Sequence, residues 1–468
     1  MPATAIVLLC GLTLTLTGAA TMAQELVSEP DDRSALSLTL YQNDLGLVRD
    51  SRRVQLLPGI SSLAFSGVSA QLRPATAHLY GEGMQVLAQN FDYDLLTPQR
   101  LLERSVGQEI GVIRTHPVTG DELEERAILL AVVEGQPVLR IDNRIETAGQ
   151  DNPWRFVFDD LPEGLRERPT LSLDLEVEGS GIRDLTLAYL TGGLSWQADY
   201  LATLSPNEQS LDLVAWATLR NDSGADYPDA RVQLLAGEVN QETSQADGGM
   251  VRMAAMAESA APPMEEQTLS DYHLYTLERP VSLPQHQAKQ VLMFQADDIP
   301  VVRHYQVSAP PAYFRLTPGE QELPVRTLLK VDNRDPALGR PLPAGMLRVY
   351  RPDNRGLLQF IGESRTGAVP EGRTLEATLG HAFDVTATRR QTDFQRVGRD
   401  ITESAFEVEL FNAKDQAVEV EVLEQLSGDW RIIQESQPHT RRSAHQVAWT
   451  VRVPAQGSAT LSYRVRSQ

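Results

Sequence analysis

Carboxylate pairs are the residues whose spacing most directly suggests chemistry in this sequence. Three pairs are adjacent or separated by one residue: Asp92 with Asp94, Asp159 with Asp160, and Asp297 with Asp298. A glycoside hydrolase needs two such groups about 5–10 Å apart across a sugar-binding cleft. Because the chain holds 63 acidic residues, some pairs arise by chance. The sequence therefore predicts solvated acids in loops, with glycan hydrolysis by an Asp/Glu pair as an alternative.

The other residue types used in catalysis form no recognised arrangement. The eight histidines include no HExxH motif and no pair four residues apart, the spacing that places two imidazoles on one helix face. Gly193-Leu194-Ser195-Trp196 resembles the start of a nucleophile elbow, but Gln197 occupies the fifth position, so Ser195 is predicted to be a strand residue. We therefore predict no catalytic, cofactor-binding or metal-binding residue.

Acidic loops leave a further alternative open, a receptor for a small ligand or a cation. The candidate segments are Asp297-Asp298 and Asp332-Asn333-Arg334-Asp335. Asn221-Asp222-Ser223 is formally a glycosylation sequon, but Gly224 follows it and Asn and Gly both tolerate positive φ, so this segment predicts a turn. The five tryptophans all fall in or beside strand patterns, which favours core packing over a carbohydrate-binding platform. The residues of any binding surface stay unknown at this level.

Composition excludes some partners and indicates the size of the fold. The 468 residues correspond to about two to four domains, and 41% hydrophobic with 22% charged residues is typical of a globular protein. Lys and Arg number 42 against 63 Asp and Glu, which gives a net charge of −21. Because nucleic acids and anionic membranes are bound through Lys and Arg, we expect no nucleic-acid partner.

The first residues predict export. Residues 4–20 are apolar or hydroxylated and uncharged, and Thr21-Met22-Ala23 offers small residues for cleavage, so residues 1–23 are predicted to be a signal peptide. An uncleaved anchor is the alternative. Cys10, the one cysteine, lies inside this segment, so the mature chain would contain no disulfide or thiol site. We expect a protein of the periplasm, the outer membrane surface or the extracellular space, with no membrane span after cleavage.

Short alternating runs separated by Gly, Pro, Asn and Asp predict an all-β chain made of several antiparallel β-sandwiches. In LDLVAWATL, for example, Leu211, Leu213 and Leu219 share one face of a strand. No internal repeat occurs at a fixed period. The expected regions are an N-terminal β-sandwich at 34–100, a small SH3-like or Sm-like β-barrel at 101–146, a central β-sandwich region at 150–398 with a low-complexity insertion at 241–270, and an immunoglobulin-like sandwich at 399–468.

One part of the central region resembles a known family. The segment SWQADYLATL, followed by LDLVAWATLRNDSGADYPDARVQLLAGEVN, is similar to the bacterial domain of unknown function 4139, in which a Trp-x-x-x-Tyr strand leads to a strand ending in Asn-x-(Ser/Thr)-Gly. The matching positions are Trp196, Tyr200, Asn221, Ser223, Gly224 and Leu235. The resemblance implies an exported all-β envelope protein and no established catalytic residues. Mucoidy-inhibitor-type relatives carry a coiled coil, but no heptad run occurs here.

These observations predict a non-catalytic exported protein of the cell envelope. Its expected role is structural or interactive, with another envelope protein or a cell-surface polymer as the partner. Exposed sheet edges and loops would provide the contacts, because an unpaired edge strand can add a strand from a partner.

Overall fold

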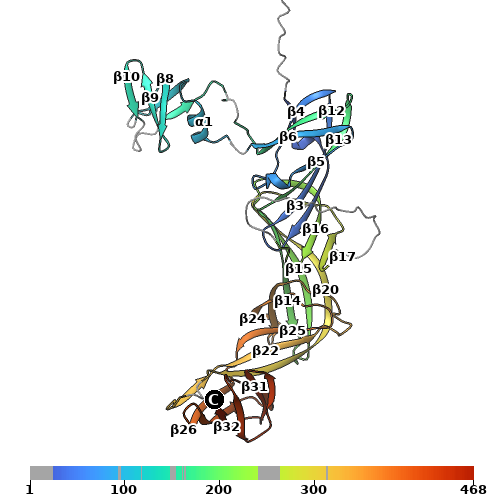
Figure 1. The fold of residues 1–468 in the computed structure, drawn as a ribbon, viewed down its shortest axis with the longest axis vertical. Coiled ribbons are helices and arrows are strands. Elements are labelled where there is room, and N and C mark those ends of the chain that lie inside the picture. The colour runs from blue at the N-terminus through green and yellow to red at the C-terminus, as the bar shows by residue number, and fades with distance from the viewer. Residues whose placement is uncertain are drawn as a thin grey trace, which may run out of the picture. The chain divides into compact units, whose positions relative to one another are not determined.

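The computed structural model describes residues 25–92, 96–116, 119–147, 154–160, 162, 165–240, 264–311 and 315–468. The chain divides into two compact units. The first comprises Met1–Leu36 and Arg49–Leu190, and the second comprises Ser37–Val48 and Thr191–Gln468. β-Strands account for nearly all of the regular secondary structure, which confirms the predicted all-β class (Figure 1). The predicted signal peptide, residues 1–23, lies outside the described residues.

The first unit contains a four-stranded sheet and a second group of strands that faces it. The four-stranded sheet has the order β1 (Leu26–Ser28), β4 (Gly59–Ser66), β12 (Thr170–Val177) and β6 (Met84–Asp92). The second group has the order β3 (Gly46–Leu56), β13 (Gly181–Thr191) and β5 (His78–Tyr80). Short 3-10 helices occur at Pro30–Asp32 (η1) and Pro74–Thr76 (η2).

Alternation of apolar residues explains how these strands form a core. On β12, Leu171, Leu173 and Leu175 are fully buried, while Asp174 and Glu176, on either side of Leu175, are exposed. On β13, Leu185 and Leu187 are fully buried in the same way. Because successive side chains of a strand point to opposite faces, this pattern gives each sheet one apolar face for the other to cover.

The first unit also contains a separate five-stranded sheet. Its order is β10 (Arg144–Thr147), β9 (Gln136–Ile141), β8 (Glu122–Val133), β7 (Glu109–Thr115) and β11 (Arg155–Val157). Among the described residues, no pairing joins β10 to β11, so the barrel predicted for 101–146 is not closed. The sheet also takes in β11, which lies beyond residue 146, and buries a small core of its own that includes Ile110, Leu129 and Leu139.

A helix precedes the first strand of this sheet, in a region for which only β structure was expected. Helix α1 spans Pro98–Arg104, and β7 follows it at Glu109. The hydroxyl of Thr97 accepts a hydrogen bond from the backbone N–H of Arg100, 3.2 Å away, and Pro98 occupies the first helical turn. An N-cap Thr followed by Pro is a strong helix start, because the cap satisfies a free N–H and Pro already has helical φ. Leu102 of α1 is buried in the core of the five-stranded sheet.

The second unit begins with a sheet built on β16 (Tyr227–Ala236). Within this unit its strands lie in the order β17 (Met264–Leu269), β18 (Tyr272–Leu277), β16 and the part of β2 (Arg33–Tyr41) from Ser37 onward. Strand β19 (Val281–Leu283) also pairs with β16. The pairing of β16 with β2 is parallel and involves Ser37–Tyr41 of β2. Residues 241–263 of the predicted insertion lie outside the described residues, and the residues that follow form β17 rather than a loop.

A ten-stranded sheet forms the largest part of the second unit. Its order is β24 (Leu358–Thr366), β23 (Gly345–Pro352), β14 (Leu194–Leu204), β15 (Ser210–Asn221), β20 (Gln287–Ala309), β28 (Val418–Gln425), β31 (Gln446–Val453) and β30 (Thr440–Ser443). In addition, β22 (Val325–Asp332) pairs with β20, and β25 (Thr374–His381) pairs with β22. A Cβ added at Gly362 of β24 would lie 2.4 Å from the carbonyl oxygen of Leu379 in β25. The sheet therefore curls until these two strands touch.

The C-terminal part of the second unit is a sandwich. A five-stranded sheet with the order β21 (Glu320–Leu323), β26 (Val385–Arg396), β27 (Thr402–Asn412), β32 (Gly457–Ser467) and β29 (Trp430–Glu435) faces β20, β22, β28 and β31. One core joins residues from both layers, among them Val307, Val385, Val408 and Val451. This sandwich therefore includes strands that precede residue 399, because the 23-residue strand β20 runs into it.

In the described part of the chain, no helix has both the length and the apolar character needed to cross a membrane.

Candidate functional site

The residues that carry the family resemblance form a buried corner where strand β15 ends. Asn221, the last residue of β15, is fully buried. Its Nδ2 donates hydrogen bonds to the carbonyl oxygens of Ala225 and Leu283, each at 2.8 Å. Its Oδ1 accepts from the backbone N–H of Ser223 at 3.1 Å and from the Ser223 hydroxyl at 2.8 Å. The side-chain amide therefore uses both its donor and its acceptor capacity to hold this corner.

Glycines allow the backbone to approach this corner closely. Gly224 has φ +88°, as the predicted turn requires. Gly193 has φ +74°, and a Cβ there would lie 2.5 Å from the Cα of Ser223. Because Asn221 is fully buried and its amide is engaged, the sequon serves as a structural turn and offers no accessible amide for a glycan.

The two aromatic residues of the resemblance also have structural partners. Trp196 of β14 is 2% exposed, and its Nε1 donates to the carbonyl oxygen of Leu235 at 3.0 Å. The hydroxyl of Tyr200 donates to the carbonyl oxygen of Pro343 at 2.7 Å. Burial, reinforced by nearby Tyr275, raises the pKa of Tyr200 well above its usual value. The phenol therefore stays protonated and acts as a donor that ties β14 to the segment before β23.

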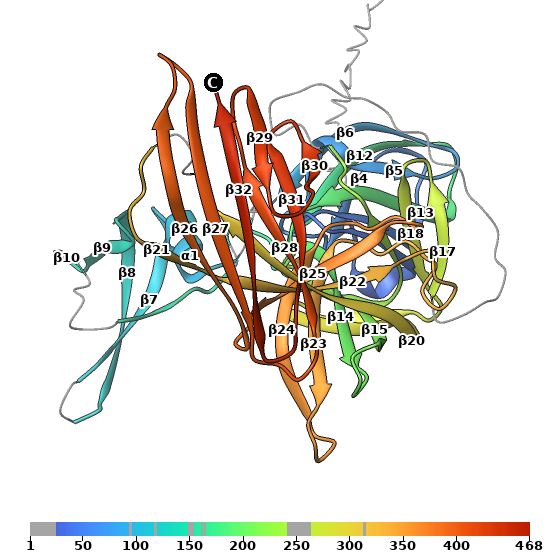
Figure 2. The same ribbon diagram turned by 90° about the horizontal axis from the view of Figure 1, so that it is seen from below.

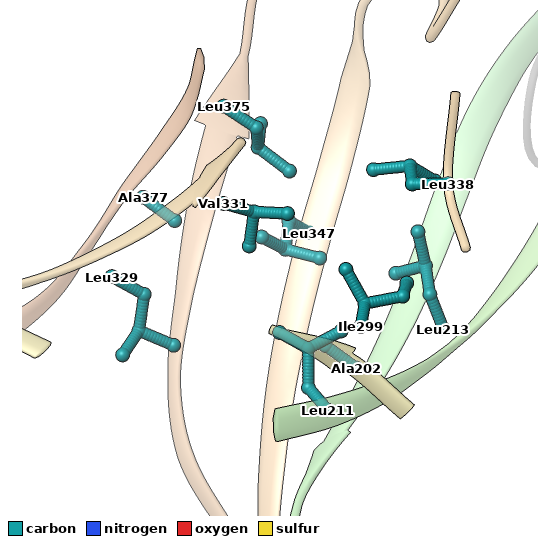
Figure 3. A pocket seen from close by; sticks show the side chains of 10 residues that line it. All are labelled: Ala202, Leu211, Leu213, Ile299, Leu329, Val331, Leu338, Leu347, Leu375 and Ala377. Atoms are coloured by element: carbon teal, nitrogen blue, oxygen red, sulfur yellow. The ribbon is translucent and has the colours of Figure 1, made fainter. Parts of the chain in front are cut away.

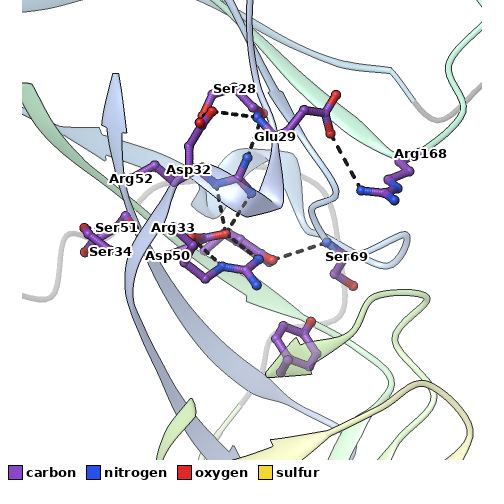
Figure 4. A network of polar contacts seen from close by, with 12 residues as sticks. Ser28, Glu29, Asp32, Arg33, Ser34, Asp50, Ser51, Arg52, Ser69 and Arg168 are labelled. Carbon is purple, nitrogen blue, oxygen red and sulfur yellow. Dashed lines mark hydrogen bonds and ion pairs between the residues drawn. The ribbon is translucent and has the colours of Figure 1, made fainter. Parts of the chain in front are cut away.

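A buried ionic cluster in the first unit has a similar structural role (Figure 4). Arg52 of β3 is fully buried, and its guanidinium donates to Oδ2 of Asp50 at 2.8 Å and to the carbonyl oxygen of Ser28 at 2.7 Å. Arg33 of β2 donates to both oxygens of Asp50, at 3.0 and 2.9 Å. The Arg52 guanidinium also lies 3.8 Å from the centre of the Phe65 ring. These contacts join β1, β2 and β4 to β3 and leave no free nucleophile or base.

Two carboxylates on strand β28 come closest to an acid–base pair, because their pKa values shift in opposite directions. Burial alone would raise the pKa of Glu421, but hydrogen bonds from Gln306, His304 and Arg442 outweigh it and lower the pKa from 4.5 to about 2. Burial raises the pKa of Glu424, against the attraction of Arg389. Residues three apart on a strand lie on opposite faces. The two groups therefore cannot act on one substrate.

Glu424 is sealed inside the C-terminal sandwich. It is 0% exposed, forms an ion pair with Arg389 at 3.1 Å and accepts a hydrogen bond from the hydroxyl of Tyr463. The Arg389 guanidinium lies 3.9 Å from the centre of the Phe406 ring. A carboxylate in such a position has no path to a substrate, so it serves the packing of the two layers.

The carboxylate pairs named from the sequence lie at the surface or in strand contacts. Asp92 accepts a hydrogen bond from the Ser172 hydroxyl at 2.8 Å, and Asp94 lies outside the described residues. Asp159 forms an exposed ion pair with Arg126, whose hydrogen bond lowers the pKa of Asp159. Asp297 and Asp298 are both exposed, at an irregularity in the pairing of β15 with β20.

The acidic loop at residues 332–335 is organised by its own backbone. Asp332 accepts from the backbone N–H of Arg334 at 3.1 Å and from its Nε at 3.0 Å, and these bonds lower the pKa of Asp332. Asn333 is buried, and its Nδ2 donates to the carbonyl oxygens of Arg340 and Pro370. Among the described residues, no group of three or more His, Cys, Asp or Glu side chains is arranged to hold a metal ion.

One enclosed space in the second unit is apolar and very small. A cavity of about 10 Å³ lies inside the curled sheet, and Figure 3 shows the ten side chains around it: Ala202, Leu211, Leu213, Ile299, Leu329, Val331, Leu338, Leu347, Leu375 and Ala377. A volume of this size holds at most one water molecule and has no polar partner for it. A groove of about 380 Å³ beside β28 and β31 is lined by Pro311, Gln425, Leu426, Ser427, Ser443, His445 and Gln446. Neither space is lined by a carboxylate.

Exposed apolar side chains gather instead at the end of the β23–β24 hairpin. Leu357, Leu358 and Phe360 are 60%, 57% and 55% exposed. The turn before them is rigid, because Asp353 accepts hydrogen bonds from the backbone N–H groups of Arg355 at 2.8 Å and Leu357 at 3.0 Å. We call the side chains of Leu357, Leu358 and Phe360 the hairpin-end patch. Figure 2 shows the hairpin projecting past the strands beside it.

Phe360 is further positioned by an aromatic contact. Its ring packs edge-on against Tyr350 of β23, with ring centroids 5.7 Å apart. Three large apolar side chains exposed close together beside an ordered turn make this hairpin end a candidate protein-binding surface. Sequence analysis missed this patch. The available signal was the run Leu357-Leu358-Gln359-Phe360, in which apolar residues occupy both faces of a strand directly after a polar turn.

Comparison with known proteins gives the family and no activity. No curated protein is significantly similar to the chain. The family model described as "Domain of unknown function (DUF4139)" matches residues 185–468, which is more than half of the chain. This match begins within β13 and includes the corner at Asn221, the hairpin-end patch and the C-terminal sandwich. The chain therefore belongs to the DUF4139 family.

Proposed function

We propose that this protein is an exported, non-catalytic component of the cell envelope that binds another envelope protein. The observation that carries the proposal is the hairpin-end patch, whose three apolar side chains are each more than half exposed at the end of a turn held by hydrogen bonds to Asp353. Export rests on the uncharged apolar segment at residues 4–20 and the small residues that follow it.

The chemistry of the patch favours a protein over a polysaccharide as the partner. The side chains of the two leucines cannot form hydrogen bonds with a sugar. The free energy gained by removing them from water is largest when an apolar pocket of a protein covers them. Covering a large apolar side chain contributes about 1.5–3 kcal/mol, so a patch of three is sufficient to centre an interface. The nearby charges, Arg351, Asp353 and Arg355, would lie at the rim, where charged groups direct association more than they add affinity.

Site-specific cross-linking in intact cells tests this proposal. A photo-reactive residue replaces Leu358, the chain is tagged after Gln468, and captured proteins are identified by mass spectrometry. We expect one recurrent envelope protein. Ile182 is the matched control position, because it is an aliphatic residue that is 71% exposed and lies outside the hairpin, at the start of β13.

A variant then links the captured protein to the patch. The substitutions Leu357→Ser, Leu358→Ser and Phe360→Ser together should abolish the association, measured with the purified captured protein. They should leave the melting temperature within a few degrees of wild type, because exposed side chains contribute little to stability. Equal capture from positions 358 and 182, or full association by the triple variant, would contradict the proposal. Capture of polysaccharide alone would favour the surface-polymer role.

A further inference from the structure

The outer face of the ten-stranded sheet carries a tryptophan, Trp216 of β15. Its neighbours on the strand, Ala215 and Ala217, are fully buried, whereas Trp216 is only half-buried. Because successive side chains of a strand point to opposite faces, the Trp216 ring lies on the face away from the core. Its indole N–H is not buried and donates to no acceptor among the described residues. Trp216 therefore departs from the core packing expected for the tryptophans.

The other tryptophans are already engaged. The indole N–H donates to a protein acceptor in three of them: Trp196, Trp430 and Trp449. The ring of Trp154 is covered by the guanidinium of Arg114, which lies 4.5 Å from its centre. Tryptophan combines a large apolar ring with a polar N–H, so it is common where one side of a residue meets a partner. Trp216 is the tryptophan placed for such a contact.

A hydrogen-bond network fixes the polar side chains around Trp216. Its centre is Asp199 of β14, which lies opposite Trp216 and is 3% exposed. The Asp199 carboxylate accepts from Nη1 of Arg348 at 2.9 Å and from Nε2 of Gln197 at 3.3 Å. It also accepts a hydrogen bond from the hydroxyl of Thr218. Side chains from three neighbouring strands are therefore held in place on this face.

Two glutamines in this network keep unused hydrogen-bonding groups. Gln290 of β20 donates to the Thr218 hydroxyl at 3.1 Å, and Gln197 donates to Asp199. Both glutamine side chains are exposed, and their amide oxygens accept no hydrogen bond among the described residues. Groups that are already ordered cost little entropy when they bind a ligand. The face therefore presents an aromatic ring with ordered donors and acceptors beside it.

The shape of this surface suits a sugar ring better than a protein side chain. The apolar neighbours of Trp216 on the same face, Leu201, Val214 and Leu292, are all half-buried, so they do not project as the hairpin-end patch does. A partner protein would find no apolar side chain here to enclose in a pocket. A pyranose ring can place its C–H face on an indole and its hydroxyls against amide groups that both donate and accept.

Charge indicates that the ligand is neutral. Asp199 and Glu363 each contact Arg348, at 2.9 and 3.4 Å, and Arg365 adds a second positive charge on the same face of β24. Two carboxylates are thus balanced by two guanidinium groups. The whole chain has a net charge of −21, so it repels anionic polymers. A charge-balanced surface on such a chain favours an uncharged ligand.

We propose that this surface binds a neutral polysaccharide. We call Gln197, Trp216, Thr218 and Gln290 the Trp216 face. The indole of Trp216 packs against the C–H face of one sugar residue, and the amides of Gln197 and Gln290 form hydrogen bonds with its hydroxyls. The inference does not rest on the proposed function, because the Trp216 face shares no side chain with the hairpin-end patch and binding is measured with the purified chain.

Affinity electrophoresis of the purified chain tests the proposal. Native gels contain dextran, galactomannan or hydroxyethyl cellulose as neutral polymers, or alginate as the anionic comparison. We expect at least one neutral polymer to retard the wild-type chain and alginate to leave its mobility unchanged. Trp216→Ala should bind about tenfold more weakly and Gln290→Ala about threefold more weakly. Gln416→Ala is the matched control, because Gln416 is exposed but lies outside the Trp216 face.

Tryptophan fluorescence gives an independent measurement that does not require removal of the ring. The retarding polymer should change the fluorescence of the wild-type chain, because a sugar then covers Trp216. Trp216→Phe keeps an aromatic ring, so it should fold and still bind, but its fluorescence should not respond. Melting temperatures show that each variant is folded. No retardation by any neutral polymer, equal retardation by alginate, or a fluorescence change that persists in Trp216→Phe would overturn the proposal.

Discussion

Two corners of the second unit, one at Asn221 and one at Asn412, have the same hydrogen-bond pattern. Each asparagine is fully buried and is the last residue of its strand, and the next strand begins six residues later. The Nδ2 of Asn412 donates to the carbonyl oxygens of Gln416 at 2.8 Å and Pro454 at 3.0 Å, and its Oδ1 accepts from the backbone N–H of Lys414 at 3.0 Å. Asn221 makes the corresponding bonds to Ala225, Leu283 and Ser223.

The difference between the corners lies in the residues around the asparagine. The first corner has Ser223, whose hydroxyl adds a hydrogen bond to Asn221 and contacts the hydroxyl of Tyr227 at 3.1 Å, whereas the second has Lys414 in the same position. The geometry therefore does not need the Ser-Gly part of the sequence motif. The motif that carries the family resemblance is therefore a strand-to-strand corner, since the same arrangement recurs at Asn412 without the serine.

Burial of the acceptor carbonyls also differs, and this determines how each corner responds to substitution. Ala225 and Leu283 are buried, whereas Gln416 and Pro454 are exposed. A carbonyl that loses its donor can be hydrated at the second corner but not at the first. Unsatisfied buried polar groups are costly, so equal substitutions should have unequal effects.

Asn221→Asp should have the largest effect. The new carboxylate would face two buried carbonyl oxygens without a cation, which costs about 3–5 kcal/mol of unfolding free energy at neutral pH. Such burial raises the pKa of the carboxyl group, so stability should recover as the pH falls and the group becomes protonated. Calorimetric melting between pH 7 and pH 4 measures this. Asn412→Asp is the control. An equal loss of unfolding free energy in both variants would contradict the prediction that burial of the acceptor carbonyls makes the Asn221 corner more sensitive.

Asn221→Ala should cost more than Asn412→Ala. We expect about 2–3 kcal/mol at position 221, where two buried carbonyls lose their donor, and about 1 kcal/mol at position 412, where water can replace the amide. Denaturant unfolding, followed by the fluorescence of the tryptophans of the second unit, compares the two variants. The reverse order would show that the exposure of the acceptors does not control the cost.

A pH series should separate the two corners further, because Glu421 lies on β28, the strand that follows the corner at Asn412. The pKa of Glu421 is lowered to about 2 from 4.5, so its hydrogen bonds stabilise the fold above pH 4.5 and are lost as the pH falls toward 2. Glu424 acts in the opposite direction, since its pKa is raised and protonation relieves its burial. Glu421→Gln should therefore lose less stability than wild type between pH 4.5 and pH 2. Melting in this range measures the difference, and parallel curves would contradict the assigned hydrogen bonds.

Ser223→Ala should have the smallest effect. It removes the hydroxyl contacts with Asn221 and Tyr227 and keeps the backbone bond to Asn221, so we expect less than about 1 kcal/mol. The variant should also capture the same partner as wild type in the cross-linking experiment. A folded Ser223→Ala protein that no longer binds the partner would give this serine a functional role and break the equivalence of the corners.

Local patterns explain which elements could be predicted from the sequence. The prediction of which residues of LDLVAWATL share the buried face is confirmed, because Leu211, Leu213 and Leu219 are buried and Asp212 is exposed. The core positions of Trp196 and Trp449 follow from the same alternation. Helix α1 was missed because its capping signal, Thr97-Pro98, is short and the helix has only seven residues. The barrel at 101–146 was wrong in its closure, because strand spacing does not specify which edges meet.

The all-β class, the strand faces, the turn at Asn221 and the family could be predicted from the sequence, because each depends on neighbouring residues. The contacts of the charged and polar groups depend on how distant strands pair. Asp50 meets Arg33 and Arg52, Glu424 meets Arg389, and the two asparagine corners resemble each other, although no repeat at a fixed period links them in the sequence. These partners come from strands far apart in the chain, so the pairing of strands, and not the local pattern, determines whether a polar residue is buried, paired or free.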